Sequence, residues 1–243
     1  GLALAYWLWR RQRAASAFLD AVTVTLIGAL VGGRLAYVAT HWTYFHDHLS
    51  ESLAIWSGGM SFHGAFLGGC LALALYALLT HQSFWPMADV LAAGLSLGAI
   101  FGWLACFASG NAYGAVGNGF LFMLAPDIYG IEAPRFALQL AGAAQSLVVL
   151  CVVLMVLRTQ RQPGMAFALF VLLYFGGQAG LELLRADESI LLGMWRLGQI
   201  VDLALTAAGL LLLVLARRRP TPVHASEAVA PAAGDGGAPP RAR

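Results

Sequence analysis

Six long apolar stretches constrain this chain more than any other feature of its sequence. They cover residues 16–40, 60–80, 87–108, 135–157, 163–185 and 194–216. Each reaches the roughly 20 mainly apolar residues that a helix needs to cross the hydrocarbon core of a bilayer. Because 60% of the residues are hydrophobic and only 11% are charged, a water-soluble fold has too little interior to cover them. The sequence therefore predicts an all-α, polytopic membrane helix bundle and excludes an ordinary soluble enzyme.

A seventh apolar segment, residues 1–9, is too short to cross a membrane. We interpret it as a truncated first span, which gives six complete spans here and seven in the full protein. Its arginines follow the apolar run, whereas those of a signal peptide precede it. We place the transmembrane domain at residues 1–218. Residues 219–243 are rich in Pro, Ala and Gly and are predicted to form a disordered tail.

The arginines orient the predicted spans. They cluster after the first segment, between the fourth and fifth complete spans, and after the last: Arg10, Arg11, Arg13, Arg158, Arg161, Arg217, Arg218 and Arg219. Strict alternation places these clusters on one side, which the positive-inside rule makes cytoplasmic together with the tail. The opposite loops, 41–59, 109–134 and 186–193, contain no arginine and are predicted to lie outside.

Several classes of protein are disfavoured by the composition. The net charge of +2 is too small to indicate a nucleic-acid partner. The three cysteines lie inside apolar runs without CxxC spacing and are predicted to be small core residues, not a disulfide framework or a zinc site: Cys70, Cys106 and Cys151. The loop histidines and acids fit no metal-binding spacing: His41, His46, Asp47, His48 and Glu51. We therefore expect no metal.

Glycines recur at every fourth position in three of the predicted spans. The repeats are Gly28 with Gly32, Gly64 with Gly68, and Gly94 with Gly98 and Gly102. Small residues at this spacing let helix backbones approach closely, so we expect tight packing at all three. The chain shows no convincing internal repeat, which argues against an inverted-repeat transporter.

Polar side chains of the spans gather at one level of the predicted bundle. The topology places these residues toward the outer face: Arg34, Tyr37, Ser61, His63, Arg135, Gln139, Gln178, Glu182, Arg185, Gln199 and Asp202. Gln178, Glu182 and Arg185 are expected to share one stripe of a helix. Ionisable groups in hydrocarbon are costly and usually functional. Several cations and a histidine at one depth suit an anionic lipid headgroup.

Several polar residues of the spans also have a structural explanation. Glu182 and Arg185 form a neutralising pair at i,i+3 spacing, and Arg34 is able to extend its charge toward the headgroups. A single histidine such as His63 is more often a packing residue. Asp20 and Asp89 lie near predicted cytoplasmic helix starts, where a carboxylate interacts favourably with the helix dipole, so we expect a structural role for both.

Two segments resemble the prolipoprotein diacylglyceryl transferase family. They are Gly32-Gly33-Arg34-Leu35-Ala36-Tyr37-Val38 and Trp56-Ser57-Gly58-Gly59-Met60-Ser61-Phe62-His63-Gly64. The family's GGRLxYV and GGMSFHG segments are close to diagnostic at this separation. Further matches are Asp89, Ser109-Gly110, Tyr113-Gly114, Glu182-Leu183-Leu184-Arg185 followed by Asp187, and Gly198-Gln199-Ile200. The resemblance covers nearly all of residues 1–218.

The resemblance implies a lipid-transfer reaction. Family members move the diacylglyceryl group of phosphatidylglycerol to the lipobox cysteine thiol of a preprolipoprotein and release glycerol phosphate. The reaction takes place at the outer face of the bacterial cytoplasmic (inner) membrane. The expected partners are phosphatidylglycerol, the preprolipoprotein signal peptide with its lipobox cysteine, and membrane lipid. No metal or organic cofactor is required, and no nucleic acid takes part.

The matched residues fit this chemistry. A thiol attacks as its thiolate, and His63 is the candidate base because imidazole exchanges protons near neutral pH. Arg34 and Arg185 are candidates to hold the phosphate, since a guanidinium makes bidentate phosphate contacts, with Glu182 orienting an arginine. The other expected substrate-binding residues are Tyr37, Ser61, Ser109, Gly110, Arg135 and Gln199.

The chain departs from the family at positions that usually carry polar groups. Trp103 and Gln178 stand where typical members have arginine, and Cys106 stands where they have asparagine. A lost charge-assisted contact costs about 1.5–3 kcal/mol, unless Arg135 or Arg196 replaces it. The alternative is therefore a catalytically weak or inactive paralogue that binds phospholipid or lipoprotein precursors. An intramembrane serine protease using Ser61 is disfavoured, because no second helix histidine is suitably placed.

Overall fold

A computed structural model describes residues 1–9, 15–159 and 162–218 of the 243-residue chain. The long helices are α1 (Leu2–Trp9), α2 (Ala15–Thr40), α4 (Phe62–Leu79), α5 (Phe84–Ser109), α6 (Leu138–Thr159), α7 (Met165–Leu181) and α8 (Leu197–Arg217). The short elements are α3 (Trp42–Phe45), the 3-10 turns η1 (Leu49–Leu53), η2 (Ile55–Ser57) and η3 (Glu182–Leu184), and the strands β1 (Phe122–Pro126), β2 (Glu132–Phe136), β3 (Leu191–Leu192) and β4 (Trp195–Arg196).

The all-α membrane architecture is confirmed. Among the described residues, six helices (α2, α4, α5, α6, α7 and α8) are long and apolar enough to cross a membrane. Each corresponds to one of the six predicted stretches, with ends that differ by a few residues. The chain is therefore a multi-pass membrane protein. The predicted tail and the arginines at 10, 11, 13, 161 and 219 lie outside the described residues.

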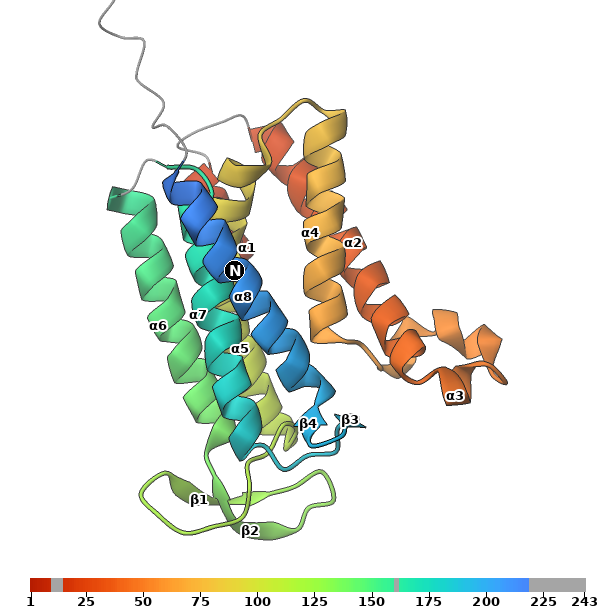
Figure 1. Cartoon of the computed structure of the whole chain (residues 1–243). Helices are drawn as coiled ribbons and strands as arrows, with labels where there is room; N and C mark the ends of the chain where they lie inside the picture. Colours follow the sequence, from red (N-terminus) through yellow and green to blue (C-terminus); the bar gives the residue numbers. More distant parts are fainter. Residues whose placement is uncertain (10–14, 160–161, 219–243) are drawn as a thin grey trace, which may run out of the picture.

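The bundle consists of two groups of helices (Figure 1). Helices α5, α6, α7 and α8 lie side by side, whereas α2 and α4 form a pair that leans away from them at the end that carries α3. Close glycine contacts join this pair: a Cβ on Gly32 would lie 2.7 Å from Cα of Gly68. Tight packing at the glycine repeats of α2 and α4 is thus confirmed.

The third glycine repeat behaves differently. A Cβ on Gly98 or Gly102 would meet no atom within 4 Å, and both residues line a cavity. The prediction of tight packing is therefore wrong for these two positions, although Gly94 does lie against α1, near Ala5. Small residues at i,i+4 spacing permit a close approach, but the neighbouring helix must also be present on that face.

The predicted outer loops lie at one end of the bundle, which Figure 1 shows with α3, the β1–β2 hairpin and the β3–β4 hairpin together. The sequence does not predict β1 and β2, and it indicates a span that begins at Arg135. Arg135 instead lies in β2, opposite Met123, and α6 begins only at Leu138. Asp127 closes the hairpin by accepting hydrogen bonds from the backbone of Tyr129 and Ile131. This Asx-type turn explains why the chain folds back here.

The opposite end is fixed by a contact between two helices. The Asp89 carboxylate in α5 accepts hydrogen bonds of 2.7 and 2.8 Å from the backbone N–H groups of Gly164 and Phe167 at the start of α7. These are groups that a helix N-terminus cannot satisfy within itself. The predicted structural role of Asp89 is confirmed, but the helix that it caps is α7, not its own.

Candidate functional site

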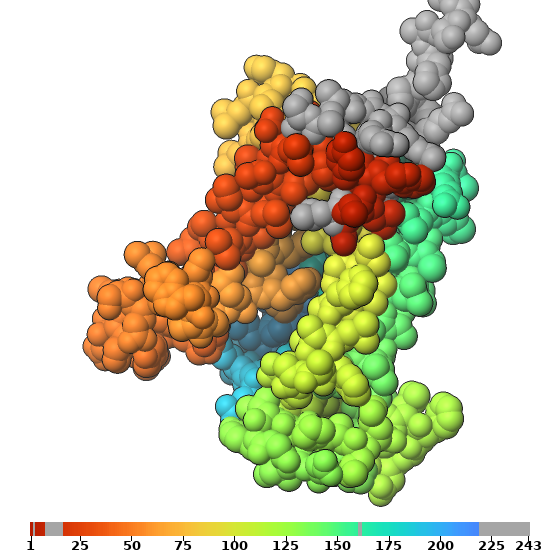
Figure 2. Space-filling view, turned by 180° about the vertical axis from the view of Figure 1, so that it is seen from behind, coloured from red at the N-terminus to blue at the C-terminus, as the bar shows by residue number. Residues whose placement is uncertain are grey.

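A cavity of about 660 Å³ runs between the α2–α4 pair and helices α5 and α7. Figure 2 shows the hollow between the segment that contains α2 and α3 and the one that contains α5. Most of its lining is apolar, and its volume falls in the range that holds small organic ligands.

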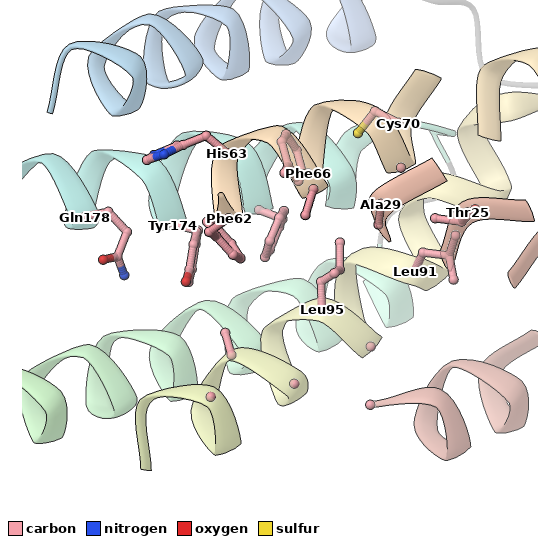
Figure 3. A pocket seen from close by; sticks show the side chains of 18 of the residues that line it. Thr25, Ala29, Phe62, His63, Phe66, Cys70, Leu91, Leu95, Tyr174 and Gln178 are labelled. Atoms are coloured by element: carbon pink, nitrogen blue, oxygen red, sulfur yellow. The ribbon is translucent and has the colours of Figure 1, made fainter. Parts of the chain in front are cut away.

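One end of this cavity is polar. Figure 3 shows His63, Gln178 and Tyr174 at one end of the labelled lining, and Thr25, Cys70 and Leu91 at the other. The polar side chains of that first end come from α4, α7, η3, the segment after η3, and α8: His63, Gln178, Glu182, Arg185 and Asp202. The sequence predicted His63, Glu182 and Arg185 as site residues, and the fold brings these three to the same cavity.

Arg185 is held by two carboxylates. Its Nη1 donates to Glu182 Oε1 at 2.8 Å, and its Nε and Nη2 donate to the two oxygens of Asp187 at 2.6 and 2.7 Å. Burial by itself would lower the pKa of Arg185, but the bonds and charges of Asp187 and Glu182 outweigh it and raise that pKa above its ordinary value. The guanidinium therefore stays charged and is fixed in orientation.

Arg185 does not share a helical stripe with Gln178, contrary to the sequence prediction. Helix α7 ends at Leu181, η3 follows, and Arg185 has an extended backbone that bridges to Gly114. Beyond the helix, Arg185 is held by Asp187 and by the backbone bridge to Gly114. Glu182 and Gln178 remain within one turn of each other.

A second arginine completes this charge network. Arg196 Nε lies 3.0 Å from Glu182 Oε2, and its Nη2 lies 3.1 Å from Asp187 Oδ1. Its Nη1 also donates to the backbone carbonyl of Arg185 at 2.9 Å. Glu182 and Asp187 therefore each contact two arginines. The sequence names Arg196 as a candidate to replace a lost positive charge. The structure places its guanidinium against Glu182, which lines the polar end of the cavity.

His63 has a carboxylate partner that the sequence analysis did not assign. Its Nε2 lies 2.8 Å from Oδ1 of Asp202, and only 3% of the Asp202 side chain is exposed. The sequence marks Asp202 as a polar residue of the last span but indicates no role for it. An ionisable residue inside a predicted span was the signal that pointed to it.

Arg34 lies away from the cavity lining. Its guanidinium donates to the backbone carbonyls of Glu51, Ser52, Gly58 and Gly59 at 2.5–2.9 Å, and the residue is 7% exposed. Tyr37 shares its face as predicted, with the Arg34 guanidinium carbon 5.8 Å from the ring centre. Arg34 thus binds the loop between α2 and α4.

The other predicted substrate-binding residues lie at the same end of the bundle but do not line the cavity. Ser61 caps α4 by accepting a hydrogen bond from Gly64, and Gly110 ends α5 with a φ of 69°. Ser109 accepts a hydrogen bond from Asn111, and Gln199 donates to the backbone of Ala179. These contacts shape the ends of α4, α5 and α7.

Arg135 is paired within the hairpin region. Its Nη2 donates to Asp127 Oδ2 at 2.9 Å, and its guanidinium lies 4.7 Å from the ring centre of Tyr113. Both charged side chains are largely buried. Arg135 therefore stabilises the β1–β2 hairpin and does not supply a charge to the cavity.

Neutral contacts replace charge at two of the positions where the sequence departs from the family pattern. Gln178 donates to Gln145 Oε1 at 2.8 Å, and Gln145 donates in turn to the backbone of Tyr174. Trp103 packs against α6, where a Cβ on Gly142 would lie 2.9 Å from its indole nitrogen. An amide pair and a partly buried indole thus join neighbouring helices there.

Loop histidines make local contacts. The Nδ1 atoms of His41, His46 and His48 lie 3.0–3.1 Å from the carbonyl oxygens of residues four positions earlier. Within the part of the chain that the structure describes, no three His, Cys, Asp or Glu side chains are grouped to hold a metal ion.

Comparisons with known proteins show the family of the chain. The family profile described as Prolipoprotein diacylglyceryl transferase matches residues 1–215. A phosphatidylglycerol–prolipoprotein diacylglyceryl transferase of Symbiobacterium thermophilum is 33% identical over 233 residues, covering 90% of this chain and 86% of that protein. Proteins of the same name from Nostoc sp. and Bacillus velezensis are 30% and 27% identical, covering 91% and 83% of this chain, and 83% and 77% of their own lengths. With its helices, its GGMSFHG segment and this match over most of its length, the chain belongs to the prolipoprotein diacylglyceryl transferase family.

Proposed function

We propose that this chain transfers the diacylglyceryl group of phosphatidylglycerol to the lipobox cysteine thiol of preprolipoproteins. The observation that carries the proposal is the meeting of His63, Glu182 and Arg185 at the polar end of an otherwise apolar cavity. An apolar cavity accepts acyl chains, and a charged end accepts the headgroup. The names of the curated relatives supply the two substrates.

The proposed location is the bacterial cytoplasmic membrane, with the polar end of the cavity at its outer face. Arginine clusters support this orientation: Arg158 and Arg217 lie at helix ends opposite the hairpins, where the positive-inside rule expects the cytoplasm. The tail that begins at residue 219 would then be cytoplasmic. A signal peptide that arrives from the outer leaflet would meet the hairpin end of the bundle.

The reaction that we propose is a nucleophilic substitution. His63 removes the proton from the lipobox thiol, and the thiolate attacks the glycerol carbon that carries the phosphate. A sulfur–carbon bond forms while that carbon–oxygen bond breaks, and its electron pair leaves with glycerol phosphate. Arg185, beside Arg196, stabilises the leaving phosphate, and Glu182 orients both guanidinium groups.

The remaining predicted substrate-binding residues have supporting positions in this proposal. Arg34 and Tyr37 hold the loop before α4, and Ser61 sets the start of the helix that carries His63. Four further predicted residues lie at the same end of the bundle, outside the cavity lining, where they shape the ends of helices and the hairpin: Ser109, Gly110, Arg135 and Gln199. Their proposed role is to support the elements that surround the polar end of the cavity.

A transfer assay tests the proposal. The purified full chain is mixed with vesicles that contain labelled phosphatidylglycerol and with a lipobox peptide, and the thioether product is measured. We expect product from the wild type, none from His63→Ala, and an unchanged rate from His46→Ala, whose ring is exposed at the same end of the bundle. Undiminished turnover in His63→Ala would remove His63 from the chemistry.

A second candidate is a paralogue that binds phospholipid or lipoprotein precursors without transferring the lipid. The pairing of Gln178 with Gln145 favours it, because a neutral amide pair replaces an expected arginine. Arg185 and Arg196 are also already paired with carboxylates, which reduces their attraction for a phosphate. Saturable binding of phosphatidylglycerol with no thioether product from the wild type would establish this candidate and refute transfer.

A further inference from the structure

His63 and Asp202 come from helices that are distant in the chain. His63 lies in the first turn of α4 and Asp202 in the second turn of α8, yet their side chains meet at 2.8 Å. Both residues line the cavity, beside Glu182 and Arg185. Gly198, one turn before Asp202, lies against both of its neighbours in the site: a Cβ there would lie 3.2 Å from Oε1 of Glu182 and 3.7 Å from Cε1 of His63.

The contact determines which ring nitrogen carries the hydrogen. An ionised carboxylate only accepts hydrogen bonds, so the nitrogen facing Asp202 must be the donor. Asp202 is 3% exposed, and its carboxylate has no other hydrogen bond among the described side chains. Burial without a partner would be costly for this carboxylate, so the bond to Nε2 of His63 is its main compensation.

The other ring nitrogen is left for a substrate. With the hydrogen on Nε2, Nδ1 carries a free lone pair, and it makes no hydrogen bond within the described part of the chain. A base that is oriented by a buried carboxylate through its second nitrogen is a recurring arrangement in enzymes that activate a nucleophile.

We propose that Asp202 is a positioning residue that fixes His63 in the Nε2–H form, so that Nδ1 is the atom that accepts the thiol proton. This inference rests on the proposed transfer and names the atom that performs its first step. The sulfur–hydrogen bond breaks and an Nδ1–hydrogen bond forms. The thiolate then attacks as described above, and His63 later releases the proton to solvent or to the departing glycerol phosphate.

Nitrogen-15 NMR tests the hydrogen position without any requirement for activity. The full chain is labelled at histidine in detergent micelles, and the His63 signals are assigned by their loss in His63→Ala. We expect wild-type His63 to carry its hydrogen on Nε2 and Asp202→Ala to lose this preference. A wild-type His63 with its hydrogen on Nδ1 would overturn the inference, whether or not the protein is active.

Kinetics test the consequence. Because a positioned base typically contributes about 10²–10⁴-fold, we expect Asp202→Asn to lower kcat at least a hundredfold with little change in KM for phosphatidylglycerol. The matched control is Asp47→Asn, an exposed acid at the same end of the bundle, which should keep wild-type rates. A wild type that forms thioether together with an Asp202→Asn variant of unchanged kcat would refute the positioning role and leave the transfer intact. A wild type that forms no thioether would refute the transfer, and the NMR result would still judge the pairing.

Discussion

Glu182 accepts a hydrogen bond of 2.8 Å from Arg185, while its second oxygen lies 3.0 Å from Nε of Arg196. One buried carboxylate therefore sets the orientation of two guanidinium groups beside the cavity. Asp187 contacts the same two arginines from the other side. The four side chains form a network whose charges cancel, so a phosphate has to compete with the carboxylates for the arginines.

Removal of the negative charge at Glu182 should disturb both arginines. We expect Glu182→Gln to lower kcat/KM for transfer about tenfold to a hundredfold, because a hydrogen bond to a charged group is worth about 1.5–3 kcal/mol. The matched control is Glu188→Gln, an exposed residue of the following loop, which should keep its rate. Equal rates in wild type and Glu182→Gln would show that the arginines keep their orientation without this carboxylate.

A larger side chain at Gly98 should obstruct the cavity without weakening the bundle. A Cβ there meets no atom within 4 Å, so Gly98→Leu should fold but project into the space proposed for an acyl chain. We expect a raised KM for phosphatidylglycerol and an unchanged melting temperature in detergent. An unchanged KM would mean that the acyl chains do not use this part of the cavity.

The α2–α4 contact should tolerate no added methyl group. At Gly32 a Cβ would lie 2.7 Å from Cα of Gly68, and neither backbone can move without separating the helices. We expect Gly32→Ala to lose about 1–3 kcal/mol of stability, the usual cost of overpacking. Gly98→Ala is the matched control in an open position, and thermal unfolding of the two variants compares them. Similar melting temperatures would argue against a close glycine contact.

Arg34 should be more important for the loop before α4 than its charge alone implies. Lysine cannot donate to four carbonyls at once, so Arg34→Lys should release residues 46–59 and increase their cleavage by added protease. We expect a loss of at least about 2 kcal/mol, given the strength of charged hydrogen bonds. Arg158→Lys, at an exposed position, is the control. Wild-type protease resistance in Arg34→Lys would contradict this role.

Asp89 should stabilise the bundle by capping α7. Asp89→Ala removes two bonds to backbone N–H groups, and loss of such a cap costs about 0.5–2 kcal/mol. We expect Asp89→Asn to fall between the wild type and Asp89→Ala, because its single carbonyl oxygen replaces one acceptor. Thermal unfolding in detergent gives the order, with the exposed residue Asp20 changed to Ala as the control. A wild-type melting temperature for Asp89→Ala would exclude the cap.

The candidate site was predicted in part from the sequence. Their positions in the spans and the resemblance predict a common site for His63, Glu182 and Arg185. The structure places all three at one cavity. Arg135 was placed in a helix but lies in a strand. The Pro126-Asp127 pair and Gly130 are turn-forming residues between two short apolar runs, a pattern that indicates a hairpin. In the structure Gly130 has a φ of 78°.

The sequence by itself determined the membrane bundle, the six spanning helices of the described residues and the gathering of polar groups at one end. Hydropathy and depth belong to each segment separately, so they are readable before the helices pack. Only the tertiary structure decided which polar groups meet: Asp202 with His63, and Arg34 with the carbonyls of a loop. These contacts depend on how each helix is rotated and on how closely its neighbour approaches. Both follow from packing between segments and not from the composition of any one of them.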